Sequence, residues 1–193
     1  MRLAILDRGH GLGAKVLFAF IRAVSRQPTP DPLKLVMYRP DFYGGPMKAI
    51  MHEAMRGPSA WSVGDRELMA AFVSRTNQSQ YCTKAHAAVA TRAYQDEARV
   101  AAALRNLDTA PIEEPLRATL RLLGKLTREH AADSEDMRAA LAAGVSRQQI
   151  EDALAVSFAL NTINRLADAF AFFTPGPEGL EAGAKHLLAR GYR

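Results

Sequence analysis

The segment SQYCTKAH, residues 79–86, contains residue types that could support thiol chemistry. Cys82 is the one cysteine of the chain, and His86 follows it by four residues. In a helix this spacing places both side chains on one face, where the imidazole can take the thiol proton or stabilise the thiolate. Ser79 stands three residues before Cys82, where a Cys-x-x-Cys motif has its other thiol. The segment is therefore a working thiol site, a broken one, or an ordinary part of the core.

The position of Cys82 along its predicted helix bears on the reactivity of the thiol. Ser79 is well placed to cap this helix, which puts Cys82 in the first turn. Unpaired backbone N–H groups and the helix dipole favour negative charge there, so the pattern predicts a lowered pKa for Cys82. The alternative is that Cys82 is a small buried apolar residue and His86 an ordinary core or surface histidine. Tyr81 is predicted to pack, with its hydroxyl at a polar edge.

Glu67 is a candidate partner from the preceding predicted helix. Its neighbours on the same side of that helix are Ala70 and Ala71, whose small side chains would let a second helix approach the carboxylate closely. The alternative is an exposed carboxylate at a helix start, which the helix dipole favours.

The elements that must position these residues are all helical, because no alternating strand or hairpin pattern is present. Capping residues, glycine and proline breaks and apolar spacing predict the helix bounds. The expected helices cover residues 12–25, 44–55, about 65–74, a helix capped by Ser79, one that begins after 108–115, 134–143, 146–173 and about 178–189. The 146–173 helix is apolar on nearly all sides, so we expect it to run through the centre of the bundle.

The expected organisation is a single all-α domain over residues 1–193. Residues 1–32 would form an N-terminal helix and linker, 33–173 the core, and 174–193 a C-terminal helix.

The stretch ELMAAFVSRTNQSQYCTKAH resembles the signature of the alkylhydroperoxidase D and carboxymuconolactone decarboxylase superfamily. That signature has a glutamate on one helix, then Cys-x-x-Cys-x-x-x-His at the start of the next. YRPDFYGGPMKAIMHEAM is similar to the lead-in helix of the family. The segment from LLGKLTREH to NRLADAF is similar to its C-terminal portion, especially in the peroxidase-related branch. The resemblance spans about residues 33–173 and implies an alkylhydroperoxidase D-like helical bundle.

The resemblance implies that Glu67, Cys82 and His86 are the catalytic residues. Ser79 departs from the signature, because it occupies the position of the first cysteine. In dithiol members, one thiol is oxidised by peroxide and the other closes a disulfide that an external reductant reopens. This chain has no second cysteine for that cycle, although a serine can still cap the helix and donate a hydrogen bond to a thiolate.

Three functions are consistent with these residues. The first is a one-cysteine thiol peroxidase, an antioxidant oxidoreductase in which Cys82 attacks a hydroperoxide, His86 and Glu67 move protons, and an external thiol reduces the sulfenic acid. The second is acid–base chemistry on a small carboxylated lactone or keto acid, with Cys82 only lining the pocket. The third is a binding or structural relative without turnover. Replacing Cys82 by serine would separate the first two functions.

Asn164 and Arg165 have a weaker claim to the site. They could close over it and bind a substrate anion, but capping a neighbouring helix or pairing with a buried carboxylate is the favoured interpretation.

Composition and charge limit the partners. The formal charge is +5, but the arginines are scattered and aromatic residues are few, so we expect no nucleic-acid partner. Lys15 and Arg22 interrupt the most apolar N-terminal run, which has no clear cleavage site, so neither a membrane span nor a secretory signal is expected. One cysteine indicates a reducing cytoplasm.

No cofactor and no metal are expected, because the five histidines do not form a ligand cluster with acidic residues. The family resemblance implies a homo-oligomer, and the apolar N-terminal helix is a candidate interface element.

Overall fold

The computed structural model describes residues 2–192, and within that range the chain forms helices and no strand. The first elements are α1 (Ile5–Arg8), α2 (Leu12–Ser25), α3 (Asp31–Tyr38), a π-helical turn η1 (Pro40–Gly44) and α4 (Gly45–Arg56). The remaining helices are α5 (Val63–Thr76), α6 (Gln80–Tyr94), α7 (Glu97–Arg105), α8 (Glu114–Glu129), α9 (Ser134–Ala142), α10 (Arg147–Ala169) and α11 (Pro177–Arg190). No helix in this range is both long enough and apolar enough to cross a membrane.

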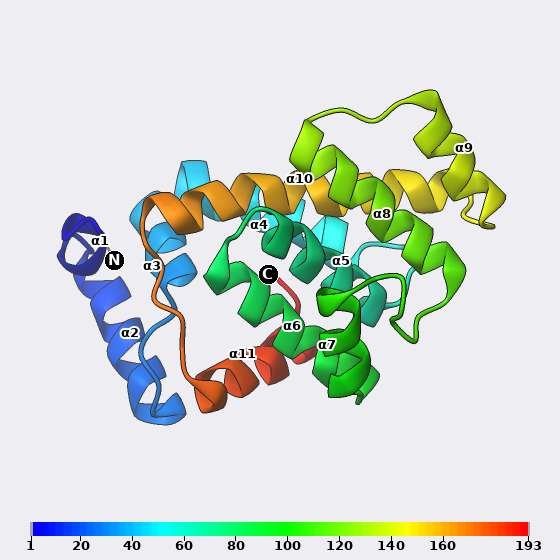
Figure 1. The fold of residues 1–193 in the computed structure, drawn as a ribbon. Coiled ribbons are helices and arrows are strands. Elements are labelled where there is room, and N and C mark those ends of the chain that lie inside the picture. Colours follow the sequence, from blue (N-terminus) through cyan, green and yellow to red (C-terminus); the bar gives the residue numbers. More distant parts are fainter. Residues whose placement is uncertain (1, 193) are drawn as a thin grey trace.

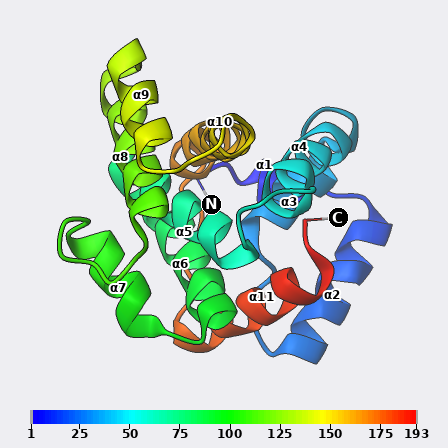
Figure 2. The ribbon, with the colours of Figure 1, turned by 90° about the vertical axis from the view of Figure 1, so that its right-hand side faces the viewer.

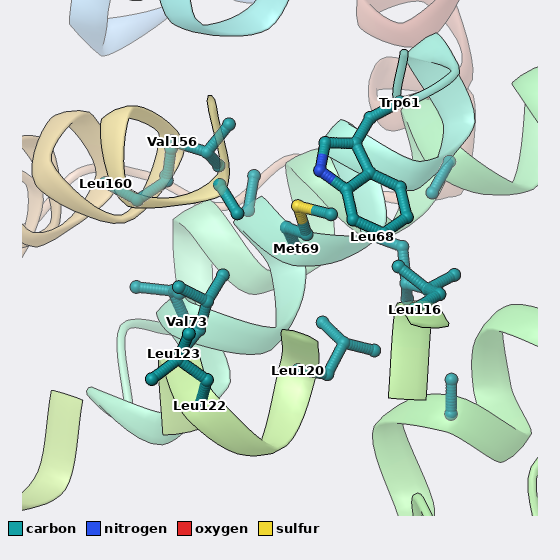
Figure 3. Close-up of a cluster of buried hydrophobic side chains, with 14 of the residues drawn as sticks. Trp61, Leu68, Met69, Val73, Leu116, Leu120, Leu122, Leu123, Val156 and Leu160 are labelled. Atoms are coloured by element: carbon teal, nitrogen blue, oxygen red, sulfur yellow. The ribbon is translucent and has the colours of Figure 1, made fainter. Parts of the chain in front are cut away.

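The main core lies between α5, α8 and α10. Figure 3 shows Leu68, Met69 and Val73 of α5 among side chains of the two other helices, with the Trp61 ring beside them. The residues from α8 and α10 that the figure labels are Leu116, Leu120, Leu122, Leu123, Val156 and Leu160. Burial of such a side chain stabilises the fold by about 1.5–3 kcal/mol relative to leaving it exposed.

The central helix of the bundle is α5, not the long helix expected from the sequence. Nine of its fourteen residues are buried, and it packs against α4, α6, α7, α8 and α10. The long helix α10 lies along one side of the bundle (Figure 1), and Phe158 on it is 62% exposed. The prediction that this helix runs through the centre is therefore wrong, because an apolar residue in a helix need not face the core of its own chain.

A second, smaller apolar cluster lies at the N-terminal side of α6. Its buried members are Leu6, Leu35, Cys82, Ala167 and Phe172, which come from α1, α3, α6, α10 and the segment after α10. This cluster ties the N-terminal helices to the rest of the bundle.

Helix α2 is at the periphery in both views of the ribbon (Figures 1 and 2), and none of its residues is buried. Leu12, Val16, Phe20 and Val24 recur every four residues and are 61–80% exposed, so α2 presents an apolar stripe outward.

Candidate active site

Glu67 is placed by the way α5 begins. Ser62 and Asp65 form a reciprocal capping box that fixes the first turn, and Glu67 follows in the second turn. A Cβ at Gly64 would lie 2.7 Å from the Tyr94 ring, so this glycine lets the end of α6 pack against the start of α5. The expectation that a second helix comes close to Glu67 is confirmed, and the alternative of an exposed carboxylate is wrong, because Glu67 is 0% exposed.

Glu67 and His86 form a buried pair between α5 and α6. Glu67 Oε2 is 2.7 Å from His86 Nδ1, and the His86 side chain is 8% exposed. A carboxylate accepts only, so the hydrogen of this bond belongs to Nδ1 and the Nε2 lone pair of a neutral imidazole is left free. The pair thus has the arrangement of a general base held by an acidic partner.

Arg56 and Tyr192 complete the cluster, and sequence reasoning identified neither. Arg56, at the end of α4, donates from Nη2 to Glu67 Oε1 at 2.7 Å, and the Tyr192 hydroxyl donates to the same oxygen at 2.9 Å. Neither residue lies in a recognisable local pattern, and they are far apart in sequence, so only the fold brings them to Glu67.

The surroundings of Glu67 hold its carboxyl in the ionised form. Burial alone raises the pKa of Glu67. The hydrogen bond and charge of His86, followed by the charge and hydrogen bond of Arg56, together lower this pKa by more than burial raises it, so the net shift is downward. Burial and the negative charge of Glu67 raise the pKa of Tyr192 well above its ordinary value, so its phenol remains a hydrogen-bond donor.

Cys82 lies in different surroundings from His86, although both are on α6. It is 2% exposed and belongs to the second apolar cluster, and no hydrogen bond joins it to His86 in residues 2–192. Burial raises the pKa of the Cys82 thiol to about 12; Ser79 lowers it and the charge of Asp168 raises it further. The expectation of a lowered pKa is therefore wrong: Cys82 is in the first turn of α6, but desolvation outweighs the helix dipole.

Ser79 is the N-cap residue of α6, but its hydroxyl does not cap the helix. The hydroxyl donates instead to Asp168 Oδ1 of α10 at 2.9 Å, and Ser79 is 0% exposed. Ser79 consequently links α6 to α10.

The supporting residues expected from sequence do not gather at the Glu67–His86 pair. Tyr81 packs edge-on against Phe172 at 5.5 Å between ring centroids, which confirms its packing role, and burial raises its pKa. Asn164 is buried and accepts a hydrogen bond from Ser74 at 3.0 Å, so it links α10 to α5. Arg165 is exposed and donates to the Asn161 carbonyl of its own helix. Closure of these two residues over the site is thus not observed.

Residues 2–192 contain no group of three or more histidine, cysteine, aspartate or glutamate side chains arranged to hold a metal ion.

Comparison with known proteins agrees with this architecture. Residues 40–125, which include Glu67, Cys82 and His86, match the carboxymuconolactone decarboxylase family. The resemblance inferred from the sequence is confirmed, over a shorter range than the expected 33–173. No curated protein matches the chain.

Two solved structures share the fold of most of the chain. An uncharacterized peroxidase-related protein from Silicibacter sp. TM1040 is similar with a TM-score of 0.73 and 24% identity, covering 85% of each chain. Another uncharacterized peroxidase-related protein, from Ralstonia eutropha JMP134 and described as an alkylhydroperoxidase AhpD core, has a TM-score of 0.73 and 19% identity over 93% of each chain. The predicted all-α, alkylhydroperoxidase D-like bundle is confirmed.

Proposed function

We propose that this chain is an enzyme that transfers protons through the Glu67–His86 pair, acting on a small carboxylated lactone or keto acid. The observation that carries the proposal is the 2.7 Å contact between Glu67 Oε2 and His86 Nδ1 in a buried site. The match of residues 40–125 to a family described as a decarboxylase family supports the substrate class.

In the proposed reaction, His86 is the general base and Glu67 remains ionised. The free Nε2 lone pair takes a proton from the substrate, and the imidazolium formed is stabilised by the carboxylate at Nδ1. The same imidazolium returns the proton to the product, so the pair ends in its initial state. Arg56 compensates the charge of Glu67, because an ionised carboxylate without a cation would be costly at this depth.

A second candidate is the one-cysteine thiol peroxidase. It is favoured by the position of Cys82, one helical turn before His86, and by the fold shared with two peroxidase-related proteins. For this reaction Cys82 must lose its proton and reach a peroxide, so α6 and the second apolar cluster would have to open. We place this candidate second because the thiol is buried and has a raised pKa.

An assay of both chemistries on the same preparations tests the proposal. Carbon dioxide release or ring opening is followed with carboxylated lactones and keto acids, and peroxide consumption is followed with an added thiol. We expect turnover of a carboxylated substrate that His86→Asn reduces by about 10²–10⁴-fold. Peroxide consumption alone, lost in Cys82→Ala, would contradict the proposal and support the second candidate.

We also propose that the chain forms a homo-oligomer, for which the exposed apolar stripe of α2 offers an interface element.

A further inference from the structure

Tyr192 reaches the Glu67–His86 pair because of the residue before it. Helix α11 ends at Arg190, and Gly191 then adopts φ +66°, a left-handed conformation that favours glycine. A Cβ at Gly191 would lie 3.0 Å from the His52 ring and 3.3 Å from Arg56 Cγ. Glycine therefore lets the chain turn closely against α4 and direct the next side chain into the bundle.

The Tyr192 side chain contacts all three other members of the cluster. Its hydroxyl lies 2.9 Å from Glu67 Oε1 and 3.3 Å from His86 Nδ1. Its ring stacks on the His86 ring, with centroids 6.2 Å apart and 25° between the planes. The Arg56 guanidinium lies 5.0 Å from the centre of the Tyr192 ring.

These contacts constrain both halves of the proton-transfer pair. The phenol and Arg56 both donate to Glu67 Oε1, which leaves Oε2 to accept from His86 Nδ1. The phenol ring, which is stacked on the imidazole of His86, limits the rotation of that imidazole. Without the hydroxyl, the carboxylate loses one of the three donors that fix its orientation.

We propose that Tyr192 is a positioning residue for the acid–base pair: it orients the Glu67 carboxylate so that His86 keeps its proton on Nδ1 and presents Nε2 to the substrate. The contribution of Tyr192 to turnover rests on the proposed function. The orientation of the Glu67–His86 pair is a property of the folded chain and can be measured without substrate.

The test compares Tyr192→Phe with a matched control, Tyr94→Phe. Phenylalanine at 192 keeps the stacked ring and removes only the hydroxyl. Tyr94 also donates its hydroxyl to a carboxylate, but to that of Asp65 and not to that of Glu67. The exchange rate of the His86 Nδ1 hydrogen with solvent is measured by NMR in full-length ¹⁵N-histidine-labelled protein. The signal is assigned from its loss in His86→Asn.

We expect Tyr192→Phe to accelerate this exchange by about tenfold and to lower kcat by a similar factor with KM unchanged, while Tyr94→Phe changes neither. An exchange rate equal to that of the wild type in folded Tyr192→Phe would overturn the proposal. The NMR result stands even if no carboxylated substrate is turned over, so failure of the proposed function and failure of this inference are distinguishable.

Discussion

One turn of α6 separates two chemically different regions. His86 contacts a buried carboxylate and a tyrosine hydroxyl, within a cluster that also contains Arg56. Cys82, four residues earlier, lies in an apolar cluster with residues of α1, α3 and α10. The spacing that puts both residues on one helix face is thus compatible with two separate environments, because different neighbouring helices cover the two turns.

The difference indicates which residues of the superfamily signature are arranged for chemistry in this chain. Glu67 and His86 are held together and charge-compensated, whereas the thiol is desolvated and Ser79 is engaged with Asp168. We therefore infer that the Glu67–His86 pair transfers protons and that Cys82 serves in packing.

The largest expected effect comes from removing the negative charge of Glu67. Glu67→Gln keeps the shape but leaves the imidazolium without a carboxylate, so kcat/KM for the carboxylated substrate should fall by about 10²–10⁴-fold. The control is Glu97→Gln, which changes an exposed carboxylate in the first turn of α7. Equal activity in folded Glu67→Gln and Glu97→Gln would show that Glu67 has only a structural role.

The apolar surroundings of Cys82 are tested by the reactivity of its thiol. With the pKa of Cys82 raised to about 12, the folded chain at pH 8 should be alkylated about 10³-fold more slowly than an ordinary cysteine thiol. Iodoacetamide labelling followed by intact mass measures the rate, and the same chain unfolded in urea is the reference. Labelling at similar rates in both states would show that Cys82 is accessible and ionisable, and would favour the peroxidase candidate.

Acid should remove the contribution that ionised Glu67 makes to the stability of the fold. The pKa of Glu67 is lowered in the folded chain, so its ionisation stabilises the fold above the ordinary glutamate pKa of 4.5, and this stability is lost as the pH falls through the folded value. The difference in unfolding free energy between wild type and Glu67→Gln should therefore narrow from pH 7 to pH 3.5 in urea titrations. A difference in unfolding free energy that stays constant from pH 7 to pH 3.5 would contradict the lowered pKa of Glu67.

The smallest expected effect concerns the link between α6 and α10. Ser79→Ala removes the hydrogen bond to Asp168 and should lower the free energy of unfolding by about 1 kcal/mol. Ser25→Ala is the control, because the exposed Ser25 hydroxyl bonds only within its own chain segment. Loss of stability no greater than in that control would mean that the Ser79 bond does not stabilise the packing of the two helices.

The sequence predicted the helices with clear caps and breaks better than the short ones. The expected 12–25 helix coincides with α2, and the Ser146–Gln149 capping box does start α10. Helices α3 and α7 were missed, since α3 begins within the expected linker, which reaches residue 32, and α7 has only nine residues. The N-cap of α9 is Asp133, whose carboxylate accepts from two backbone N–H groups.

The candidate site was predictable only where its residues follow a local pattern. Glu67 and His86 were found because they recur in a signature on two adjacent helices. Arg56 and Tyr192 could not be found in that way, since each reaches Glu67 from a helix end through tertiary packing. The environment of Cys82 was mispredicted for a related reason: the helix dipole is a local property, whereas desolvation depends on residues of three other elements.

The most direct test of the central claim is the turnover of Cys82→Ala beside that of His86→Asn, with a carboxylated lactone as substrate. Both positions lie on α6, and each variant removes one of the two side chains that the signature brings to this helix. We predict that Cys82→Ala retains kcat/KM within about twofold while His86→Asn loses at least about 10²-fold. Equal loss of turnover in the two variants would contradict it, and would show that the thiol takes part in the chemistry.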